Sequence, residues 1–160
     1  MIELDMEFYL GNLSIDIKIW SKIDNKFIDA AAIFDTGAHI THVDTNSLRR
    51  LGYNLDNAGT GSVGTVGSGH IPINNIIIDN IIIGDLKTGA IFVNFSDLSN
   101  ISCPVIIGLN IIKEFNVTLD FANMKMLLEP NFDVKSVTPA DKFYKYDSRF
   151  GMWNIGLNNK

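Results

Sequence analysis

Alternation of apolar and polar residues marks the first recognisable element of the chain. Residues 13–19 read Leu-Ser-Ile-Asp-Ile-Lys-Ile, which is the period of a strand with one buried face. Asp24-Asn25 then indicates a turn. Residues 27–34 are mostly small or apolar, so we expect a strand that is buried on both faces and ends immediately before Asp35.

The rest of the pattern predicts further short strands and two short helices. The helices are expected at 45–51, with Asp44 or Thr45 as N-cap and Gly52 as the stop, and at 109–115. The β-branched and apolar runs that predict strands are 71–78, 81–83, 90–93, 104–108, 117–121 and 124–128. Many short strands with few helices predict an all-β, closed barrel-like domain.

The pattern weakens after Pro130, which sets the domain boundary. We assign residues 1–130 to the β domain and residues 131–160 to a C-terminal extension. The extension mixes charged residues with many aromatic ones. It is too aromatic for a solvated tail, so we expect it to pack on the domain or on a dimer.

Composition and charge exclude several classes of function. The chain has 160 residues, 46% of them hydrophobic, and a net charge of -5 without a basic run, so nucleic acid is not expected as a partner. No signal peptide and no apolar run of roughly 18 to 20 residues is present, so we expect no membrane contact. The single cysteine, Cys103, excludes an intrachain disulfide and is compatible with a cytoplasmic location.

Five glycines within residues 59–69 form the most unusual local composition. Residues 59–64, Gly-Thr-Gly-Ser-Val-Gly, match the dinucleotide-binding pattern G-x-G-x-x-G. That site requires a strand before the glycines and a helix after them, whereas polar residues precede them here and Pro72 follows. We therefore interpret the segment as a glycine-rich hairpin and expect no cofactor.

The candidate chemistry lies in residues 33–40, Ile-Phe-Asp-Thr-Gly-Ala-His-Ile. Asp35 stands between an apolar strand and a glycine that permits a tight turn. The alternative is an ordinary turn, because Asp, Thr and Gly are all common in turns. Three features favour a site. The flanking strand is apolar rather than polar, and a short helix and then a glycine-rich segment follow the motif. Residues 105–112, Val-Ile-Ile-Gly-Leu-Asn-Ile-Ile, also repeat the order of apolar strand, glycine and helix.

In these motifs and their order, the sequence resembles the retroviral-type aspartic proteases, or retropepsins, over roughly residues 10–130. The resemblance implies a closed β domain and peptide hydrolysis by two aspartates that share a proton and activate a water. Asp-Thr-Gly occurs only once in the sequence. The second acid is therefore expected from another copy of the chain, so that a homodimer brings together one Asp35 from each protomer.

The resemblance also implies roles for individual residues. Asp35 is the expected catalytic residue, supported at the active-site loop and the dimer contact by Thr36, Gly37 and Ala38. A flap is expected to close over an extended peptide or protein substrate. The expected substrate-binding residues are His39, Gly64, Thr65, Val66, Gly67 and Ile107.

Two alternatives to a protease site concern the same part of the chain. One is a metal site, since His39, His42 and Asp44 are close in sequence, but the whole chain has only three histidines and one cysteine, so we do not expect one. The other alternative is a catalytically silent or weak module for dimerisation or peptide binding, in which Asp-Thr-Gly is kept for structure.

Overall fold

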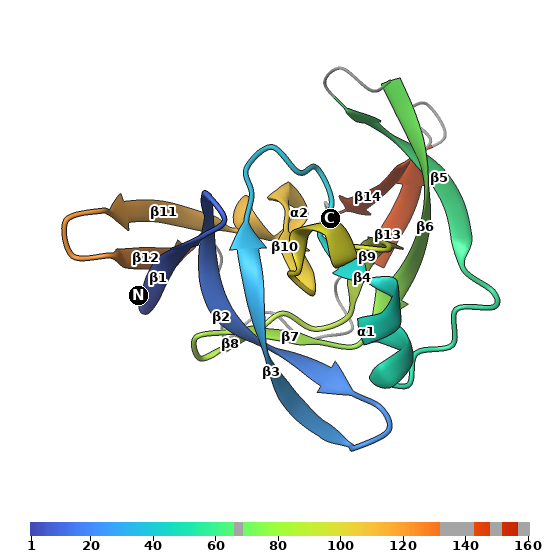
Figure 1. Ribbon diagram of the computed structural model, residues 1–160, viewed down its shortest axis with the longest axis horizontal. Coiled ribbons are helices and arrows are strands. Elements are labelled where there is room, and N and C mark those ends of the chain that lie inside the picture. Colours follow the sequence, from blue (N-terminus) through green and yellow to red (C-terminus); the bar gives the residue numbers. More distant parts are fainter. Residues whose placement is uncertain (66–68, 132–142, 148–151, 157–160) are drawn as a thin grey trace.

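The computed structural model describes residues 1–65, 69–131, 143–147 and 152–156, and strands make up most of it (Figure 1). The strands before the first helix are β1 (Ile2–Tyr9), β2 (Asn12–Ser21), β3 (Lys26–Phe34) and β4 (His42–Asp44). Those that follow are β5 (Gly59–Thr65), β6 (Gly69–Ile78), β7 (Ile81–Ile83), β8 (Leu86–Lys87), β9 (Ile91–Ser96), β10 (Val105–Ile107), β11 (Phe115–Asp120), β12 (Lys125–Pro130), β13 (Phe143–Asp147) and β14 (Met152–Gly156). The helices are α1 (Thr45–Arg50), the 3-10 turn η1 (Ser99–Ile101) and α2 (Leu109–Ile112). The prediction of a mainly β chain with two short α-helices is confirmed.

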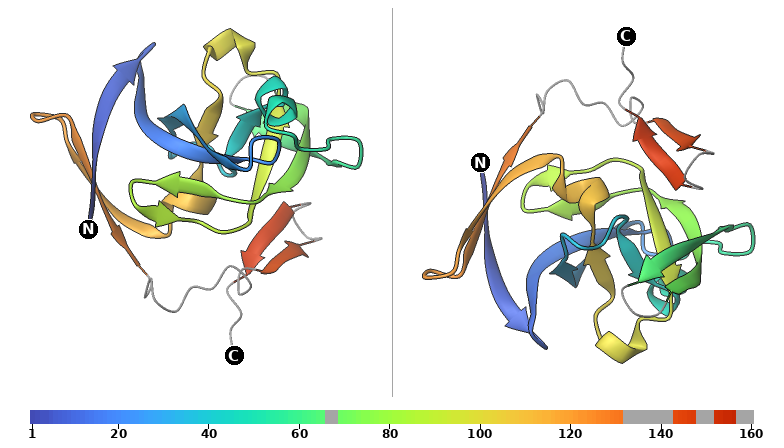
Figure 2. Two further views of the ribbon diagram at one scale, coloured as in Figure 1. Left: turned by 90° about the horizontal axis from the view of Figure 1, so that it is seen from below. Right: turned by 90° about the horizontal axis from the view of Figure 1, so that it is seen from above.

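One twelve-stranded sheet holds the domain together. Its strand order is β11-β12-β1-β2-β3-β10-β4-β9-β6-β5, and β7 and β8 branch from β2. Two pairs in it are parallel, β3 with β10 and β4 with β9. The views in Figure 2 show the β1, β11 and β12 arm on one side of the molecule and the β5–β6 hairpin on the other.

The expectation of a closed barrel was wrong, because the described strand order runs as an open path from β11 to β5. The physical reason lies in β2, whose outer edge changes partner along its length. Met6 of β1 pairs with Ile15, whereas Ile83 of β7 pairs with Ile17. The sheet thus divides into two arms at β2, and among the described residues no ladder joins the arms at the far side.

The core follows the alternation that the sequence shows. Ile15, Ile17 and Ile19 of β2 are all buried, and the polar residues between them are exposed. Full burial of an aliphatic side chain of this size contributes about 1.5–3 kcal/mol. The arrangement of the sheet therefore depends on many such side chains rather than on any single contact.

Strand β3 is buried only at the end that leads into Asp35. Ala32 and Ile33 are buried, whereas Asp29 and Ala31 are exposed, so the expected burial on both faces holds for the last part of the strand alone. The reason is that β10 pairs with β3 only from Val105 onward.

The helices form where the sequence places their caps. The Asp44 carboxylate accepts a hydrogen bond from the Ser47 N–H at 2.8 Å, which satisfies one of the free N–H groups at the start of α1. Gly52 follows with a φ of +84°, a conformation that favours glycine. Helix α2 is shorter than predicted, because β11 already begins at Phe115. No helix among the described residues is long and apolar enough to cross a membrane.

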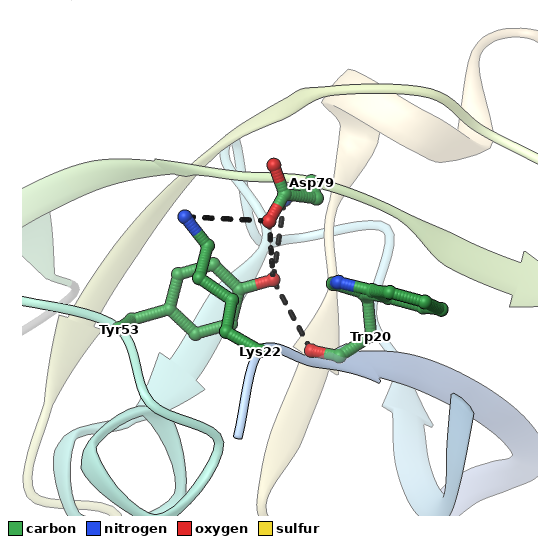
Figure 3. A network of polar contacts seen from close by, with 4 residues as sticks. All are labelled: Trp20, Lys22, Tyr53 and Asp79. Carbon is green, nitrogen blue, oxygen red and sulfur yellow. Dashed lines mark hydrogen bonds and ion pairs between the residues drawn. The ribbon is translucent and has the colours of Figure 1, made fainter. Parts of the chain in front are cut away.

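A buried tyrosine ties together the two ends of the β5–β6 hairpin (Figure 3). Tyr53 precedes β5, and Asp79 directly follows β6. The Tyr53 hydroxyl donates to the Trp20 carbonyl at 3.2 Å and accepts a hydrogen bond from the Asp79 N–H at 3.2 Å. Lys22 lies 4.9 Å from the ring centroid and pairs with the Asp79 carboxylate at 3.4 Å. Burial raises the pKa of Tyr53 to about 12, and the Asp79 charge adds to that effect.

The C-terminal extension contains a separate two-stranded sheet. Strands β13 and β14 pair antiparallel, with Tyr146 opposite Trp153. This sheet shares no ladder with the twelve-stranded sheet among the described residues. Its packing on the domain or on a dimer stays a prediction.

Candidate active site

Asp35 directly follows β3 and lies beside the end of β10. The parallel ladder pairs Ile33 with Ile106 and Phe34 with Ile107. The Asp35 N–H continues that ladder by donating to the Ile107 carbonyl at 3.0 Å. The two motifs singled out in the sequence are therefore neighbours in space, and a sheet backbone holds the base of the carboxylate.

The turn after Asp35 fixes one oxygen of its carboxylate. The Gly37 N–H donates to Asp35 Oδ1 at 2.8 Å, and the Ala38 N–H donates to the Asp35 carbonyl at 3.3 Å. A Cβ at Gly37 would lie 3.1 Å from Asp35 Oδ1, tighter than most real contacts. Glycine therefore lets the backbone approach the carboxylate closely enough to hydrogen-bond it.

The turn faces outward. Thr36, Gly37 and His39 are exposed, whereas Asp35 and Ala38 are half-buried. The carboxylate thus sits between the core and solvent. A partner chain or a ligand can reach all five residues without unfolding of the domain.

Gly108 allows the chain after Asp35 to lie directly against the end of β10. A Cβ at Gly108 would lie 2.7 Å from the Ile40 carbonyl carbon and 2.8 Å from both the Ala38 oxygen and the Thr41 nitrogen. These are backbone atoms, so a side chain does not fit. The Leu109 N–H then donates to the Ala38 carbonyl at 2.8 Å, which fastens α2 to the loop.

A buried amide, not predicted from the sequence, supports the loop from behind. Asn110 Oδ1 accepts hydrogen bonds at 2.7 Å from both the N–H and the hydroxyl of Thr41. Asn110 Nδ2 donates to the Phe92 carbonyl at 2.9 Å, and the Gly108 N–H donates to Thr41 Oγ1 at 3.1 Å. The one sequence signal was the amide within Gly-Leu-Asn-Ile-Ile, since a polar side chain in a buried helix requires partners.

Of the two histidines near Asp35, His39 is exposed and His42 is half-buried. His42 is on β4, and its Nε2 lies 2.7 Å from Ser96 Oγ, while burial lowers the pKa of His42. Burial acts to raise the pKa of Asp44, but hydrogen bonds from the backbone of Leu98 and Ser47 outweigh it and hold that pKa below its ordinary value. Among the described residues, no three His, Cys, Asp or Glu side chains gather as they would around a metal ion.

The expected flap residues are only partly described. On β5, Gly64 pairs with His70 and Thr65 pairs with Gly69, so the backbone there forms the predicted hairpin. Val66 and Gly67 lie outside the described residues. At the hairpin base the Asn75 side chain packs against Gly59, where a Cβ would lie 2.2 Å from Asn75 Oδ1 and would displace that side chain.

Ile107 contacts the site through its backbone. We expect it to line the substrate site, but its side chain is fully buried in this single chain. Its carbonyl, by contrast, accepts the Asp35 N–H. In this structure Ile107 therefore supports the Asp35 turn rather than presenting a side chain to a ligand.

A search of solved structures finds proteins similar to this chain, although no protein-family model and no curated protein matches the sequence. One is the crystal structure of a retropepsin-like aspartic protease from Rickettsia conorii, with a TM-score of 0.54 and 16% identity, covering 79% of this chain and 87% of that one. Another is EIAV protease complexed with the inhibitor HBY-793, with a TM-score of 0.48 and 18% identity, covering 67% of this chain and 91% of that one. Together with the strand order and the Asp35 turn, the first likeness shows that this chain has a retropepsin-like fold.

Proposed function

We propose that the chain is an aspartic endopeptidase that acts as a homodimer, with Asp35 of each protomer forming half of the catalytic pair. The observation that carries this proposal is the state of the Asp35 carboxylate. Oδ1 is fixed by the Gly37 N–H, whereas Oδ2 has no hydrogen-bond partner among the described residues. A carboxylate on a rigid turn with one oxygen open is suited to hold a reacting water.

The second carboxylate comes from a second copy of the chain. Because Asp-Thr-Gly occurs once in the sequence, a two-fold axis beside the turn is the simplest way to bring two such carboxyls together. Thr36, which is exposed next to Asp35, then holds the two loops together across that axis, with Gly37 and Ala38 beside it.

The chemistry follows from two carboxyls that share one proton. At about 3 Å apart they do not ionise together, so one acts as base while the other stays protonated. The ionised carboxyl takes a proton from water, whose oxygen bonds to the peptide carbonyl carbon as the other carboxyl protonates the carbonyl oxygen. The C–N bond then breaks as the nitrogen gains a proton, which releases a carboxylic acid and an amine.

The proposed substrate is an extended peptide or an unfolded protein. The β5–β6 hairpin closes over it through Gly64, Thr65, Val66 and Gly67, and His39 lines the cleft beside Asp35. An extended chain is held by main-chain hydrogen bonds, as in strand addition. No cofactor is required, and a cytoplasmic location fits a chain with one buried cysteine.

The test is the substitution Asp35→Asn. We expect cleavage of an unfolded protein to fall by at least about a thousandfold, the scale of lost acid–base catalysis, while sedimentation still shows a dimer. Asp16→Asn, at an exposed carboxylate on β2, is the matched control and keeps full activity. Full activity of the Asp35→Asn protein, or a monomer in the active preparation, contradicts the proposal.

One observation favours a silent binding module instead. The bond from the Gly37 N–H to Asp35 Oδ1 gives the aspartate a structural role in the turn that needs no chemistry. Such a module still dimerises or binds peptides but cleaves nothing. Absence of cleavage of an unfolded protein anywhere between about pH 4 and 7, with the dimer intact, would favour it.

We propose that residues 1–130 form the protease-like domain and that residues 131–160 are an extension that packs on it or on the dimer. Truncation after Pro130 tests the extension. A change in dimerisation or in cleavage assigns it a role at the dimer or the cleft. If both stay unchanged, the packing role is rejected.

A further inference from the structure

A pocket of about 490 Å³ lies away from the Asp35 turn, between β3, α1 and the segment that enters β10. That volume is within the usual range for ligand sites. Its lining comes from the β2–β3 hairpin, from α1 and its end, and from Pro104 and Val105. Residues 35–39 do not line it, so the proposed active site does not account for it.

Small side chains open this pocket. Residues 30–32 are three consecutive alanines on β3, and two of them, Ala30 and Ala31, line the pocket. Alanine is depleted in strands, where larger β-branched residues pack better. The three alanines therefore leave a space beside β3. The buried side chains of Val43 and Leu51 also line this space.

The first part of β3 also presents unpaired backbone groups on the side facing the pocket. The Trp20 N–H donates to the Asn80 carbonyl, away from β3, and Trp20 pairs with Phe27. In an antiparallel ladder this makes Phe27 and every second residue after it point their N–H and C=O away from β2. By that alternation Asp29 and Ala31 point the same way as Asp35, which bonds β10.

That edge is open because β10 begins only at Val105, opposite Ala32. The residue before it, Pro104, turns its carbonyl toward β4, where it accepts the Asp44 N–H at 2.8 Å, and so bonds away from β3. At the end of this edge the Cys103 thiol makes a weak contact with the Ala31 carbonyl, at 3.6 Å. The N–H groups of Phe27, Asp29 and Ala31 have no partner among the described residues.

The charge at the pocket selects the kind of ligand. Asp29 pairs with Lys18, and the Asp24 carboxylate accepts from the Ser21 hydroxyl. Arg50, by contrast, makes no ion pair among the described residues and only a 3.3 Å hydrogen bond to Ser47. Arg50 is therefore the one cation among the lining residues and is available to an acidic group, whereas Asp24 keeps its negative charge at the β2–β3 hairpin, because its partner Ser21 is neutral.

We propose that this groove binds an extended segment of another protein, which adds as a strand to the β3 edge and carries an acidic side chain to Arg50. The main chain of the segment bonds Phe27, Asp29 and Ala31, and a small apolar side chain enters the space above Ala30. The carboxylate pairs with the Arg50 guanidinium. This docking site is independent of Asp35 and of whether the chain cleaves peptides.

The first experiment asks whether the edge is open. Amide hydrogen exchange of the full chain, read at Asp29 and Ala31, is expected to be fast at all protein concentrations. Protection that disappears on truncation after Pro130 shows that the chain's own extension occupies the edge. Protection that grows with concentration shows a second copy there. Either outcome overturns the proposal.

The second experiment identifies the ligand chemistry, with a phage-displayed library of random 12-residue peptides as the probe. The full chain carrying Asp35→Asn serves as bait, so that no peptide is cleaved. Selected peptides are expected to share one acidic residue and to slow exchange at Asp29 and Ala31. A failure to select any peptide, or selected peptides that leave those amides unchanged, overturns the proposal.

Matched variants complete the test. Arg50→Glu is expected to weaken binding of a selected peptide at least tenfold, whereas Arg49→Glu, next to it but outside the pocket lining, changes it less than twofold. Ala31→Pro removes an N–H that faces away from β2, so the domain folds but the strand no longer adds fully. Equal losses in the two arginine variants would indicate general charge attraction and contradict the site.

Discussion

Strands β3 and β10 run in parallel and end side by side, yet their ends carry opposite kinds of polar group. At the end of β3 the Asp35 carboxylate is half-buried, with one oxygen held by the Gly37 N–H. After β10 the Asn110 amide is buried, and both its oxygen and its nitrogen are hydrogen-bonded within the domain. The same order of apolar strand and glycine thus serves once to present a carboxylate near the surface and once to support its turn from within the domain.

The glycines at the two ends make this comparison sharpest, and Gly108→Ala has the largest expected effect. The added Cβ meets three backbone atoms at 2.7–2.8 Å, which do not move as a flexible side chain does. We expect the free energy of unfolding to fall by about 3 kcal/mol or more, measured by urea denaturation. A fall below about 1 kcal/mol would mean that the two loops do not need their close approach.

Asn110→Leu tests the supporting role directly. The leucine leaves the Thr41 N–H and the Phe92 carbonyl without the amide that bonds them, at a cost of about 2–3 kcal/mol in unfolding free energy. Asn116→Leu, at an exposed position on β11, is the control and shifts stability by less than about 0.5 kcal/mol. Similar losses of unfolding free energy in the two variants would contradict a supporting role for the buried Asn110 amide.

Gly37→Ala is the counterpart of Gly108→Ala at the other strand end. Its Cβ meets only Asp35 Oδ1, at 3.1 Å, so the carboxylate shifts while the backbone stays in place. We expect a loss of less than about 1 kcal/mol in stability but a drop of about tenfold to a hundredfold in peptide cleavage. Unchanged cleavage with reduced stability would reverse the roles assigned to the two ends.

His42→Gln gives the smallest effect, and it concerns pH. Because burial lowers the pKa of His42, the unfolded chain takes up the proton first as pH falls. The stability that neutral His42 contributes is therefore present above pH about 6.5 and is lost as pH falls through its lower folded pKa. Unfolding free energies at pH 7.5 and 5.5 should differ less in the variant, and an equal difference in both proteins contradicts the assignment.

The sequence predicts the local parts of this site better than their assembly. The order of strand, Asp35 turn, hairpin and second strand is visible because each piece is a short apolar run with a glycine. The pairing of Ile33 with Ile106 could be expected only from the likeness of the two motifs, because no local pattern specifies a parallel pair of strands. The bonds of Asn110 to Thr41 join residues 69 positions apart and have no periodic signal.

Other differences have equally specific causes. Strand β1 was not predicted, although Ile2, Leu4 and Met6 alternate with acidic residues as a strand requires. The exposure of the first part of β3 depends on where β10 begins, at Val105, which is distant in sequence and which no pattern within β3 reveals. The open sheet depends on β2 taking three neighbours, which the pattern of one strand does not reveal.

The bonds between Thr41 and Asn110 also set an order of events during synthesis of the chain. Asp35 leaves the ribosome long before Asn110, and until the later segment follows, its turn has neither β10 beside it nor an amide behind it. Contacts of such long sequence separation form late in folding. A nascent chain therefore carries the Asp35 carboxylate without the framework that orients it, and the proposed pair of carboxyls can assemble only after almost the whole domain has been translated.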